Sequence, residues 1–341
     1  MRPIRVGVLG CGYWGPKLAR NFHEMDDAEL AWVCDLDAEH LARVASLYPE
    51  ARATTDFHSM LRSDIEAVAI ATPVSSHYRL AKETLEHGKH VLVEKPLATS
   101  TVEATALAQL ADRRGLAAMV GHTFQHNPAV NAVRDLIREG ELGDLYYIDA
   151  TRANLGLYQP DINVMWDLAP HDISILLHLL GTDPIEVSAQ GAACVQRHKR
   201  VQDVVYLKLF FPNDVMASIR VSWLDPVKTR RLIVVGSRKM LVYDDIADSK
   251  VVLFDKGVEI PEYTVTPEEF HLSYRHGPET SVPYHWREPL RIECEAFIEW
   301  ITSGRRACSD AWMGAKVVRV LEAAQRSLLD GGRRGPCCDE G

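Results

Sequence analysis

The chain has 341 residues, of which 47% are hydrophobic and 25% charged, which is typical of a globular protein with room for two domains. Its 38 Lys and Arg against 47 Asp and Glu give a net charge of −9, which argues against a nucleic-acid-binding protein that works through positive charge. The most apolar stretch, residues 173–181, is far shorter than the ~20 residues needed to cross a bilayer, so no membrane partner is expected. Seven cysteines without pairing or zinc spacing suggest reduced thiols in a cytoplasm.

The first 121 residues alternate short β-branched runs with amphipathic stretches, which predicts an α/β domain with a doubly wound parallel sheet and helices on both faces. Strands are predicted at Ile4–Leu9, Leu30–Cys34, Ala67–Ala71, His90–Val93 and Leu116–Val120. Helices are predicted between them at Trp14–Glu24, Ala38–Leu47, Ser76–His87 and Val102–Arg113.

After residue 127 the pattern changes to mostly strands, which predicts a second, α+β domain over residues 122–330 with a large, mostly antiparallel sheet. The predicted strands are Leu145–Ala153, Ile185–Gln190, Val204–Phe211, Val215–Trp223, Arg231–Val235 and Met240–Tyr243. Helices are predicted at Ala129–Glu139, Leu168–Leu180, Arg287–Ser303 and Met313–Leu329. Residues 258–289, with five prolines, are expected to form a long ordered loop, and residues 331–341, which carry Cys337 and Cys338, a frayed tail.

A G-x-G-x-x-G motif follows the first predicted strand, at Gly10, Gly12 and Gly15, with Tyr13 and Trp14 inside the turn. The first glycine permits the tight turn, the second lets the backbone approach a pyrophosphate, and the third lets helix and strand pack closely. The alternative is a glycine turn in an unrelated α/β fold. Asp35, at the end of the second strand, has the spacing of a carboxylate that binds ribose hydroxyls and repels a 2′-phosphate, which favours NAD over NADP. Helix capping is the competing role for Asp35, although Asp37 is better placed for it.

The loop Ala71-Thr72-Pro73 follows the next buried strand, at the carboxyl edge where open α/β sheets bind ligands. Its small side chains would let the backbone pass close to a cofactor. His77, just beyond, joins the candidate cofactor residues, although packing is the simpler account of it. Glu94 and Lys95 end the fifth strand at the same edge and join this set.

With V-E-K-P at residues 93–96, ATPVSSH at 71–77 and Asp167-x-x-x-His171, the chain resembles the Gfo/Idh/MocA oxidoreductases, the glucose–fructose oxidoreductase and inositol dehydrogenase family, over about residues 4–325. The stretches at 12–22 and 222–245 look more like the sugar-nucleotide branch. The resemblance implies a Rossmann domain and a second domain whose open sheet carries substrate and mediates oligomers. It also implies NAD(P)-dependent oxidation of a sugar or polyol hydroxyl, usually without metal.

Lys95 is held extended by the following proline and would project into the ligand crevice, where its ammonium can polarise a substrate oxygen. An ion pair with Glu94 is the alternative. Asp167 and His171 lie four residues apart, on one helical face, so that the carboxylate could orient the imidazole as a general base. The alternative makes Asp167 an N-cap and His171 a passenger of the first turn.

Four further residues are candidate substrate contacts: His122 and Phe124 in the domain crossover, and Arg152 and Asn154 at a strand end. A zinc site at His122 and His126 is disfavoured because Gly121 and Pro128 make a regular helix there improbable, so no metal is expected. A strand-end ion pair is the competing account of Arg152.

The sequence therefore predicts an NAD-dependent dehydrogenase that oxidises a secondary hydroxyl of a nucleotide-linked sugar to a keto-sugar, at C3 by analogy, or runs in reverse as a ketosugar reductase. Its catalytic residues would be Lys95, Asp167 and His171. The alternatives are a free-polyol dehydrogenase of the inositol type, an NAD-retaining glycosidase without net redox change, and a non-catalytic NAD-binding regulator. A homodimer or homotetramer built on the C-terminal sheet is expected.

Overall fold

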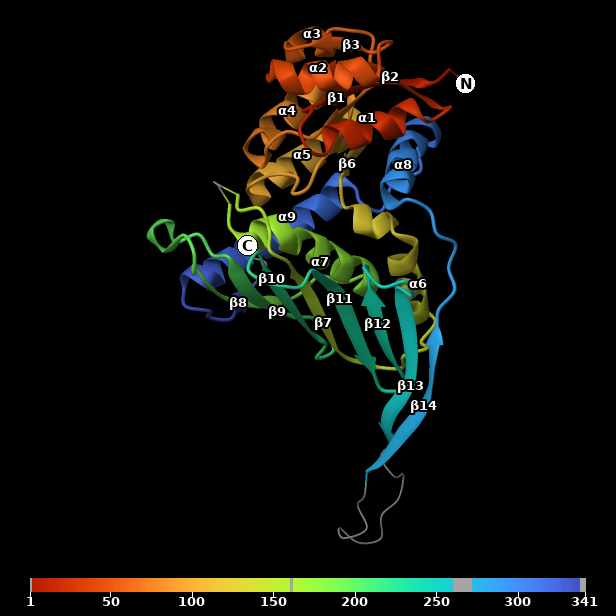
Figure 1. Ribbon diagram of the computed structural model, residues 1–341, viewed down its shortest axis with the longest axis vertical. Coiled ribbons are helices and arrows are strands. Elements are labelled where there is room, and N and C mark those ends of the chain that lie inside the picture. Colours follow the sequence, from red (N-terminus) through yellow and green to blue (C-terminus); the bar gives the residue numbers. More distant parts are fainter. Residues whose placement is uncertain (1, 160–161, 260–271, 338–341) are drawn as a thin grey trace. The chain divides into compact units, whose positions relative to one another are not determined.

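The computed structural model describes residues 2–159, 162–259 and 272–337 (Figure 1). By its internal contacts the chain forms two compact units: Met1–Asn127 with Arg287–Glu322, and Pro128–Trp286 with Ala323–Gly341. The first unit thus includes residues 287–322, which the sequence analysis assigned to the second domain.

The first unit is built on a parallel six-stranded sheet with the strand order β3-β2-β1-β4-β5-β6. Its strands are β1 (Ile4–Leu9), β2 (Ala28–Cys34), β3 (Arg52–Thr54), β4 (Ala67–Ile70), β5 (His90–Val93) and β6 (Ala118–Val120). Its helices are α1 (Gly15–His23), α2 (Ala38–Leu47), α3 (Phe57–Leu61), α4 (Val74–Glu86), α5 (Thr101–Arg114), the 3₁₀ turn η1 (Thr123–His126) and α8 (Pro289–Ser303), while α9 (Ala311–Leu329) runs across the boundary of the units. The strand order reverses between β1 and β4, which opens a crevice at their carboxyl ends.

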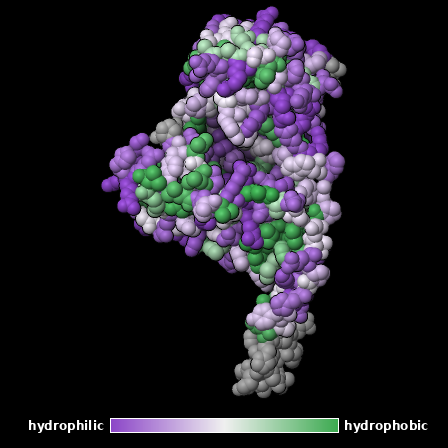
Figure 2. All heavy atoms as spheres, in the orientation of Figure 1, coloured by the Kyte–Doolittle hydropathy of each residue, from purple (hydrophilic) through white to green (hydrophobic). Residues whose placement is uncertain are grey.

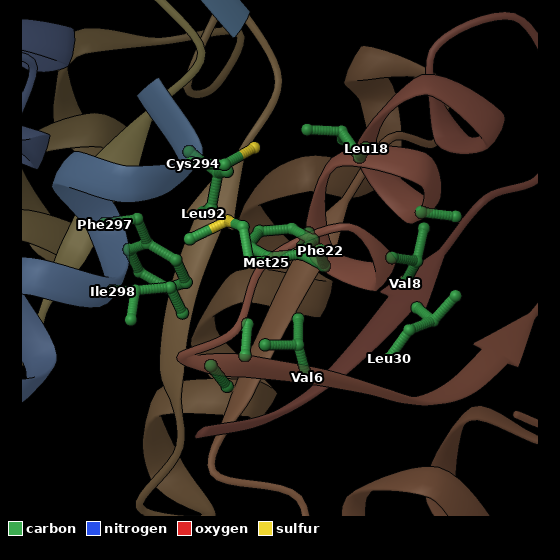
Figure 3. Close-up of a cluster of buried hydrophobic side chains, with 14 of the residues drawn as sticks. Val6, Val8, Leu18, Phe22, Met25, Leu30, Leu92, Cys294, Phe297 and Ile298 are labelled. Atoms are coloured by element: carbon green, nitrogen blue, oxygen red, sulfur yellow. The ribbon is translucent and has the colours of Figure 1, made fainter. Parts of the chain in front are cut away.

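The core of this unit includes side chains of α8, a helix from the C-terminal part of the chain. Figure 3 shows Phe297 and Ile298 of α8 beside Phe22 of α1 and the strand residues Val6 and Leu92. All five side chains are almost completely buried. Burial of this apolar surface attaches residues 289–303 to the first sheet.

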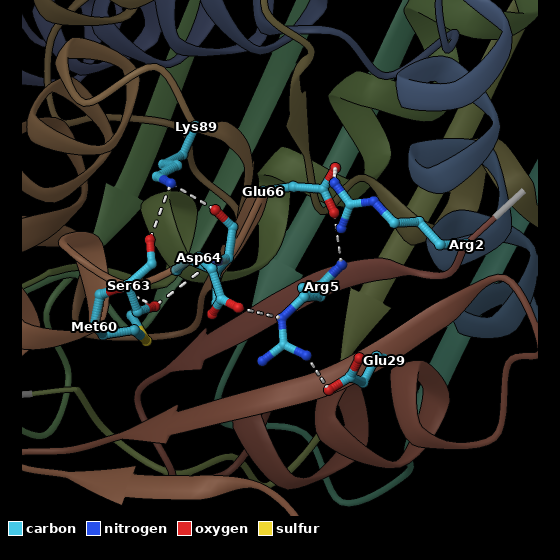
Figure 4. Close-up of polar contacts among 9 residues, drawn as sticks. Arg2, Arg5, Glu29, Met60, Ser63, Asp64, Glu66 and Lys89 are labelled. Carbon is cyan, nitrogen blue, oxygen red and sulfur yellow. Dashed lines mark hydrogen bonds and ion pairs between the residues drawn. The ribbon is translucent and has the colours of Figure 1, made fainter.

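Charged residues close the opposite edge of the first sheet, where β1 begins (Figure 4). The Arg5 guanidinium bonds Glu29 at 2.5 Å and lies 3.3 Å from Asp64, and the Lys89 ammonium donates to the Ile65 carbonyl at 2.6 Å. These contacts tie the segments leading into β1, β2, β4 and β5 together. Exposed ion pairs of this kind contribute little each.

The second unit carries a nine-stranded sheet in the order β14-β13-β12-β11-β7-β10-β9-β8-β15. In it β7 and β10 pair in parallel, and every other pair of neighbouring strands in this order is antiparallel. The strands are β7 (Leu145–Ala153), β8 (Glu186–Ala192), β9 (Val204–Phe210), β10 (Met216–Ser222), β11 (Thr229–Gly236), β12 (Met240–Asp244), β13 (Val251–Glu259), β14 (Ser273–Ser281) and β15 (Gly335–Pro336). The helices α6 (Pro128–Arg138) and α7 (Val164–Leu180) pack against it, α7 on β7, β9 and β10, and η2 (Arg197–Lys199) is a short 3₁₀ turn.

The predicted fold class is confirmed, and several predicted elements need correction. The loop expected at residues 258–289 is wrong in part, because β13 extends to Glu259 and β14 pairs with it, while residues 260–271 lie outside the described chain. Residues 335–337 do not fray: β15 pairs with β8, and Cys337 is buried with its N–H bonded to the Ile185 carbonyl, whereas Cys338 lies outside the described residues. Strand β3 and helix α3 correspond to none of the predicted elements. No helix in the described part of the chain is long and apolar enough to cross a membrane.

Candidate active site

The glycine turn between β1 and α1 needs two of its glycines for its own packing. Gly10 has φ +94°, and a Cβ there would lie 2.7 Å from the Ala71 carbonyl carbon and oxygen. A Cβ on Gly15 would lie 1.7 Å from the Gly10 carbonyl oxygen. At Gly12, by contrast, a Cβ would meet nothing within 4 Å. The middle glycine therefore faces open space, as a backbone position that a ligand approaches would.

Asp35 closes this turn from the end of β2. Its carboxylate accepts the Cys11 N–H at 2.5 Å and the Asp37 N–H at 2.8 Å, which ties the glycine turn to the loop after β2. Capping of α2 belongs to Asp37, whose carboxylate accepts the N–H groups of Glu39 and His40. The capping alternative for Asp35 is therefore wrong.

A cavity of about 730 Å³ opens at this carboxyl edge of the sheet. Its wall includes Gly10, Gly12, Asp35, Ala71, Thr72 and Pro73 of the predicted set. It also includes residues that the sequence analysis missed: Leu36, Asp37, His40, Asp56, His58 and Arg79. The volume suits a cofactor site, and an open glycine before a helix N-terminus, with a carboxylate beside it, fits a dinucleotide.

Besides Gly15, five predicted cofactor residues are not among the described residues that line this cavity: Tyr13, Trp14, His77, Glu94 and Lys95. The Lys17 ammonium lies over the rings of Tyr13 and Trp14, at 3.5 and 4.1 Å from their centroids, so these aromatics hold a cation at the start of α1. Gly15 is likewise outside the wall, since its role is the contact with Gly10 described above.

His77 braces the two loops that follow β4 and β5. Its ring is buried, with Nδ1 2.8 Å from the Pro96 carbonyl oxygen and Nε2 2.8 Å from the Thr72 carbonyl oxygen. Burial lowers its pKa and thereby favours the neutral ring, which can donate to only one of the two oxygens. This geometry favours packing over contact with a ligand.

Glu94 and Lys95 follow β5, and the Lys95–Pro96 peptide is cis. Burial raises the pKa of Glu94 to about 7, and its Oε2 accepts the Lys95 N–H at 3.3 Å. The Glu293 carboxyl of α8 is also buried, and burial together with Glu94 raises its pKa well above the usual range. The carboxyl of Glu94, which bonds the Lys95 N–H, and the carboxyl of Glu293 are thus both buried and both retain a proton to higher pH than exposed carboxyls do.

The crossover residues after β6 are held inside the first unit. His122 is 1% exposed, and burial lowers its pKa to about 3, so its ring is neutral. His126 lies 2.9 Å from the Ser309 hydroxyl through Nε2, and Phe124 is partly buried in the same 3₁₀ turn. Among the described residues, no three His, Cys, Asp or Glu side chains gather as a metal site.

In the second unit, α7 begins earlier than predicted, at Val164, with Asn163 as its N-cap accepting the Trp166 N–H at 3.2 Å. Asp167 is therefore inside the helix, and the N-cap alternative for it is wrong. Asp167 and His171 lie one turn apart on α7, and the Asp167 carboxylate accepts the indole N–H of Trp223 at 3.0 Å. Both residues belong to the second unit, and Lys95 to the first.

Arg152 forms the strand-end ion pair that the sequence analysis kept as its alternative. Its guanidinium donates to both carboxylate oxygens of Asp172 on α7, at 2.8 and 3.1 Å, and both residues are buried. This bidentate pair fixes the helix on β7 rather than offering the guanidinium to a substrate. Asn154 extends the β7–β10 pairing through its backbone N–H, which donates to the Ser222 carbonyl at 3.1 Å.

Models of known protein families match parts of both units. A family model described as "Oxidoreductase family, NAD-binding Rossmann fold" matches residues 4–122, and one described as "GFO/IDH/MocA C-terminal domain" matches residues 130–242. The chain is 28% identical to UDP-N-acetylglucosamine 3-dehydrogenase of Acidithiobacillus ferrooxidans, over 94% of this chain and 95% of that protein. The solved structure of that enzyme superposes with a TM-score of 0.81, at 26% identity over 97% of this chain and 99% of that one.

Two other proteins are similar in different ways. The dTDP-3,4-didehydro-2,6-dideoxy-alpha-D-glucose 3-reductase of Streptomyces antibioticus is 31% identical, over 63% of this chain and 68% of that protein. GenD2 from gentamicin A biosynthesis, solved in complex with NAD, has a TM-score of 0.83 at 23% identity, covering 98% of this chain and 97% of that one, and supports the fold.

Proposed function

Because the chain belongs to the GFO/IDH/MocA family of NAD-binding oxidoreductases, we propose that it oxidises a secondary hydroxyl of a nucleotide-linked sugar to the keto-sugar. The family makes the protein an NAD-dependent oxidoreductase that acts on CH–OH groups. The observation that carries the finer proposal is the Asp167 and His171 pair, one turn apart on α7 with the carboxylate anchored by an indole. Similarity to two nucleotide-sugar enzymes named for carbon 3 supports that substrate class and that position.

Each residue of the proposed trio has a distinct task. His171 accepts the hydroxyl proton, and Asp167 orients the imidazole and balances its charge when it becomes protonated. Lys95 places a positive charge beside the substrate oxygen as negative charge develops on it. NAD supplies the hydride acceptor when bound, and the turn around Gly12, with Asp35, holds it.

We also propose a homodimer or homotetramer formed through the face of the nine-stranded sheet that α6 and α7 leave uncovered. Along β7, β9 and β10, Ile148, Leu207 and Ile219 face the helices and are buried, while Tyr147, Tyr206 and Met216 on the other face are 44, 55 and 37% exposed. Met216 lies directly opposite Tyr147 in the sheet register. In Figure 2 apolar surface is visible over parts of this unit beside polar surface. Contiguous exposed apolar surface is typical of association surfaces.

The test is a substrate screen of the purified protein with NAD. We expect NADH to form with one or more UDP-, dTDP- or GDP-linked sugars and not with free inositols. A substrate carrying deuterium at C3 should react with a primary isotope effect and transfer the label to the reduced cofactor. Oxidation of free inositols alone overturns the nucleotide-sugar proposal, and an isotope effect only from another carbon overturns the position.

Variants of the trio test the assignment of roles. Lys95→Ala and His171→Ala should each lower kcat by about 100-fold or more, the scale of a general acid–base group. NAD affinity should change little, because neither residue lines the cavity at the glycine turn. Normal turnover by His171→Ala together with an inactive His122→Ala would move the base to the crossover segment.

A further inference from the structure

Trp223, the residue that follows β10, is the largest fully buried side chain among the described residues, at 1% exposed. Its only polar side-chain atom, Nε1, donates to Asp167 Oδ2 at 3.0 Å. The two residues are 56 apart in sequence and meet because α7 packs on β10. The largest fully buried side chain in the described part of the chain thus bonds the carboxylate of the proposed catalytic pair.

The indole is held on several sides, so its N–H points in one direction. The Trp223 backbone N–H donates to the Asp203 carbonyl at 2.9 Å, and its carbonyl accepts the Gly156 N–H at 3.0 Å. The Tyr158 ring packs at 5.1 Å between centroids with a tilt of 49°. Gly156 has no side chain, and a Cβ there would lie 2.6 Å from the indole Cδ1, so the β7 extension passes directly against the ring.

An indole N–H is a donor that neither accepts nor titrates in the range where enzymes work. A bond from it to a carboxylate is charge-assisted and short-ranged, and it fixes which oxygen is engaged and how the carboxylate plane is turned. Rotation of a carboxylate about its last bond is otherwise broad. The bond from Trp223 therefore restrains the orientation of the Asp167 carboxylate.

We propose that Trp223 is a positioning residue, which holds the Asp167 carboxylate in the orientation that directs His171 as the base. The inference rests on the proposed function, because it acts only through Asp167. Trp223 itself has no part in the proton or hydride transfer. Loss of the indole N–H lowers kcat by about 10–100-fold, the range for a hydrogen bond to a charged group, and leaves the KM for NAD unchanged.

Trp166, on the same helix as Asp167, provides a matched control. Trp166 also donates through its indole N–H, but to the Gln325 amide oxygen at 3.2 Å. Trp166→Phe removes an indole bond of similar length without touching Asp167. We expect it to keep kcat within about threefold of the parent enzyme, as for a neutral hydrogen bond.

The experiment measures kcat and the KM for NAD in Trp223→Phe and Trp166→Phe, each alone and combined with Asp167→Ala. Trp223→Phe should be slow in the parent background and have less than about a twofold effect in Asp167→Ala, because an effect routed through Asp167 disappears with it. An isosteric benzothienylalanine at position 223, which replaces the N–H by sulfur, gives the same readout if phenylalanine impairs folding.

The outcomes separate this inference from the proposed function. If Asp167→Ala lowers kcat but Trp223→Phe keeps the parent kcat, the role of Trp223 is overturned and the catalytic pair stands. A Trp223→Phe that loses the same factor in both backgrounds shows a structural effect and overturns it as well. An Asp167→Ala of parent kcat overturns both the catalytic pair and the inference built on it.

Discussion

Gly12→Ala separates cofactor binding from folding, because the structure leaves nothing within 4 Å of the added methyl group. The backbone at Gly12 is not in the left-handed region, so alanine fits without strain. Loss of glycine freedom in the unfolded chain should stabilise the cofactor-free protein by about 0.4–1 kcal/mol, or roughly 1–3 °C in Tm for a unit of this size. The same methyl stands at the wall of the 730 Å³ cavity, where the pyrophosphate would approach the backbone.

The assay is thermal unfolding with and without NAD. At 100 times its Kd, NAD stabilises the parent protein by about 2.7 kcal/mol, and a 100-fold loss of affinity reduces this to about 0.4 kcal/mol. Gly15→Ala is the contrast, because its Cβ would lie 1.7 Å from the Gly10 carbonyl oxygen, and it should destabilise the cofactor-free protein by about 3 kcal/mol or more. A parent-sized NAD shift in Gly12→Ala would refute the placement of the cofactor. A less stable cofactor-free Gly12→Ala would refute the argument from open space.

Three other outcomes are expected. Asp35→Ser should weaken NAD binding and narrow the preference over NADP in calorimetric titrations, since it removes both the ribose contact and the repulsion of a 2′-phosphate; a parent enzyme that prefers NADP contradicts this. Burial lowers the pKa of His178 to about 4 in the folded protein. As the pH drops from about 6.5 toward 4, the unfolded chain therefore binds a proton at His178 before the folded protein does. The free energy of unfolding should fall over this range, by about 2 kcal/mol at pH 5. Urea unfolding of His178→Gln should lack that part of the pH dependence, and an unchanged dependence contradicts the buried neutral ring. Met216→Asp on the uncovered sheet face should lower the molar mass seen by light scattering, and a parent protein that is monomeric at micromolar concentration removes the association proposal.

The strands that could be predicted from sequence are those with apolar runs. Ile4–Leu9 and His90–Val93 are buried strands of a parallel sheet, and their β-branched residues identify them without neighbours. The edge strand Arg52–Thr54 has polar and partly exposed side chains, and Ser273–Ser281 contains Gly277, Pro278 and several charges. Such strands exist because a neighbour offers backbone partners and ion pairs such as Lys256–Glu279, and no local pattern predicts them.

The sequence likewise did not predict to which of the two units helix α8 belongs. Its apolar residues predict an amphipathic helix, but periodicity says only that one face is buried, not against which sheet. Cys294, Phe297 and Ile298 pack against the first sheet, more than 250 residues from Val6 and Val8. A long-range choice of this kind depends on the shape of both surfaces, which composition does not encode.

In the candidate site, too, the features formed by local sequence could be predicted and those formed by distant partners could not. The glycine turn with Asp35 could be read from spacing, because one strand, one turn and one helix position every group in it. On α7, spacing indicated a pair, Asp167 and His171. The partners that hold this helix are Trp223, just after β10, which bonds Asp167, and Arg152 of β7, which bonds Asp172. A base and its orienting carboxylate need an angular precision that one helix turn alone does not supply, because both side chains rotate. Rigid groups brought from neighbouring strands supply it, so a local pattern could suggest the pair on α7 but not Trp223, which bonds one of its members across 56 residues.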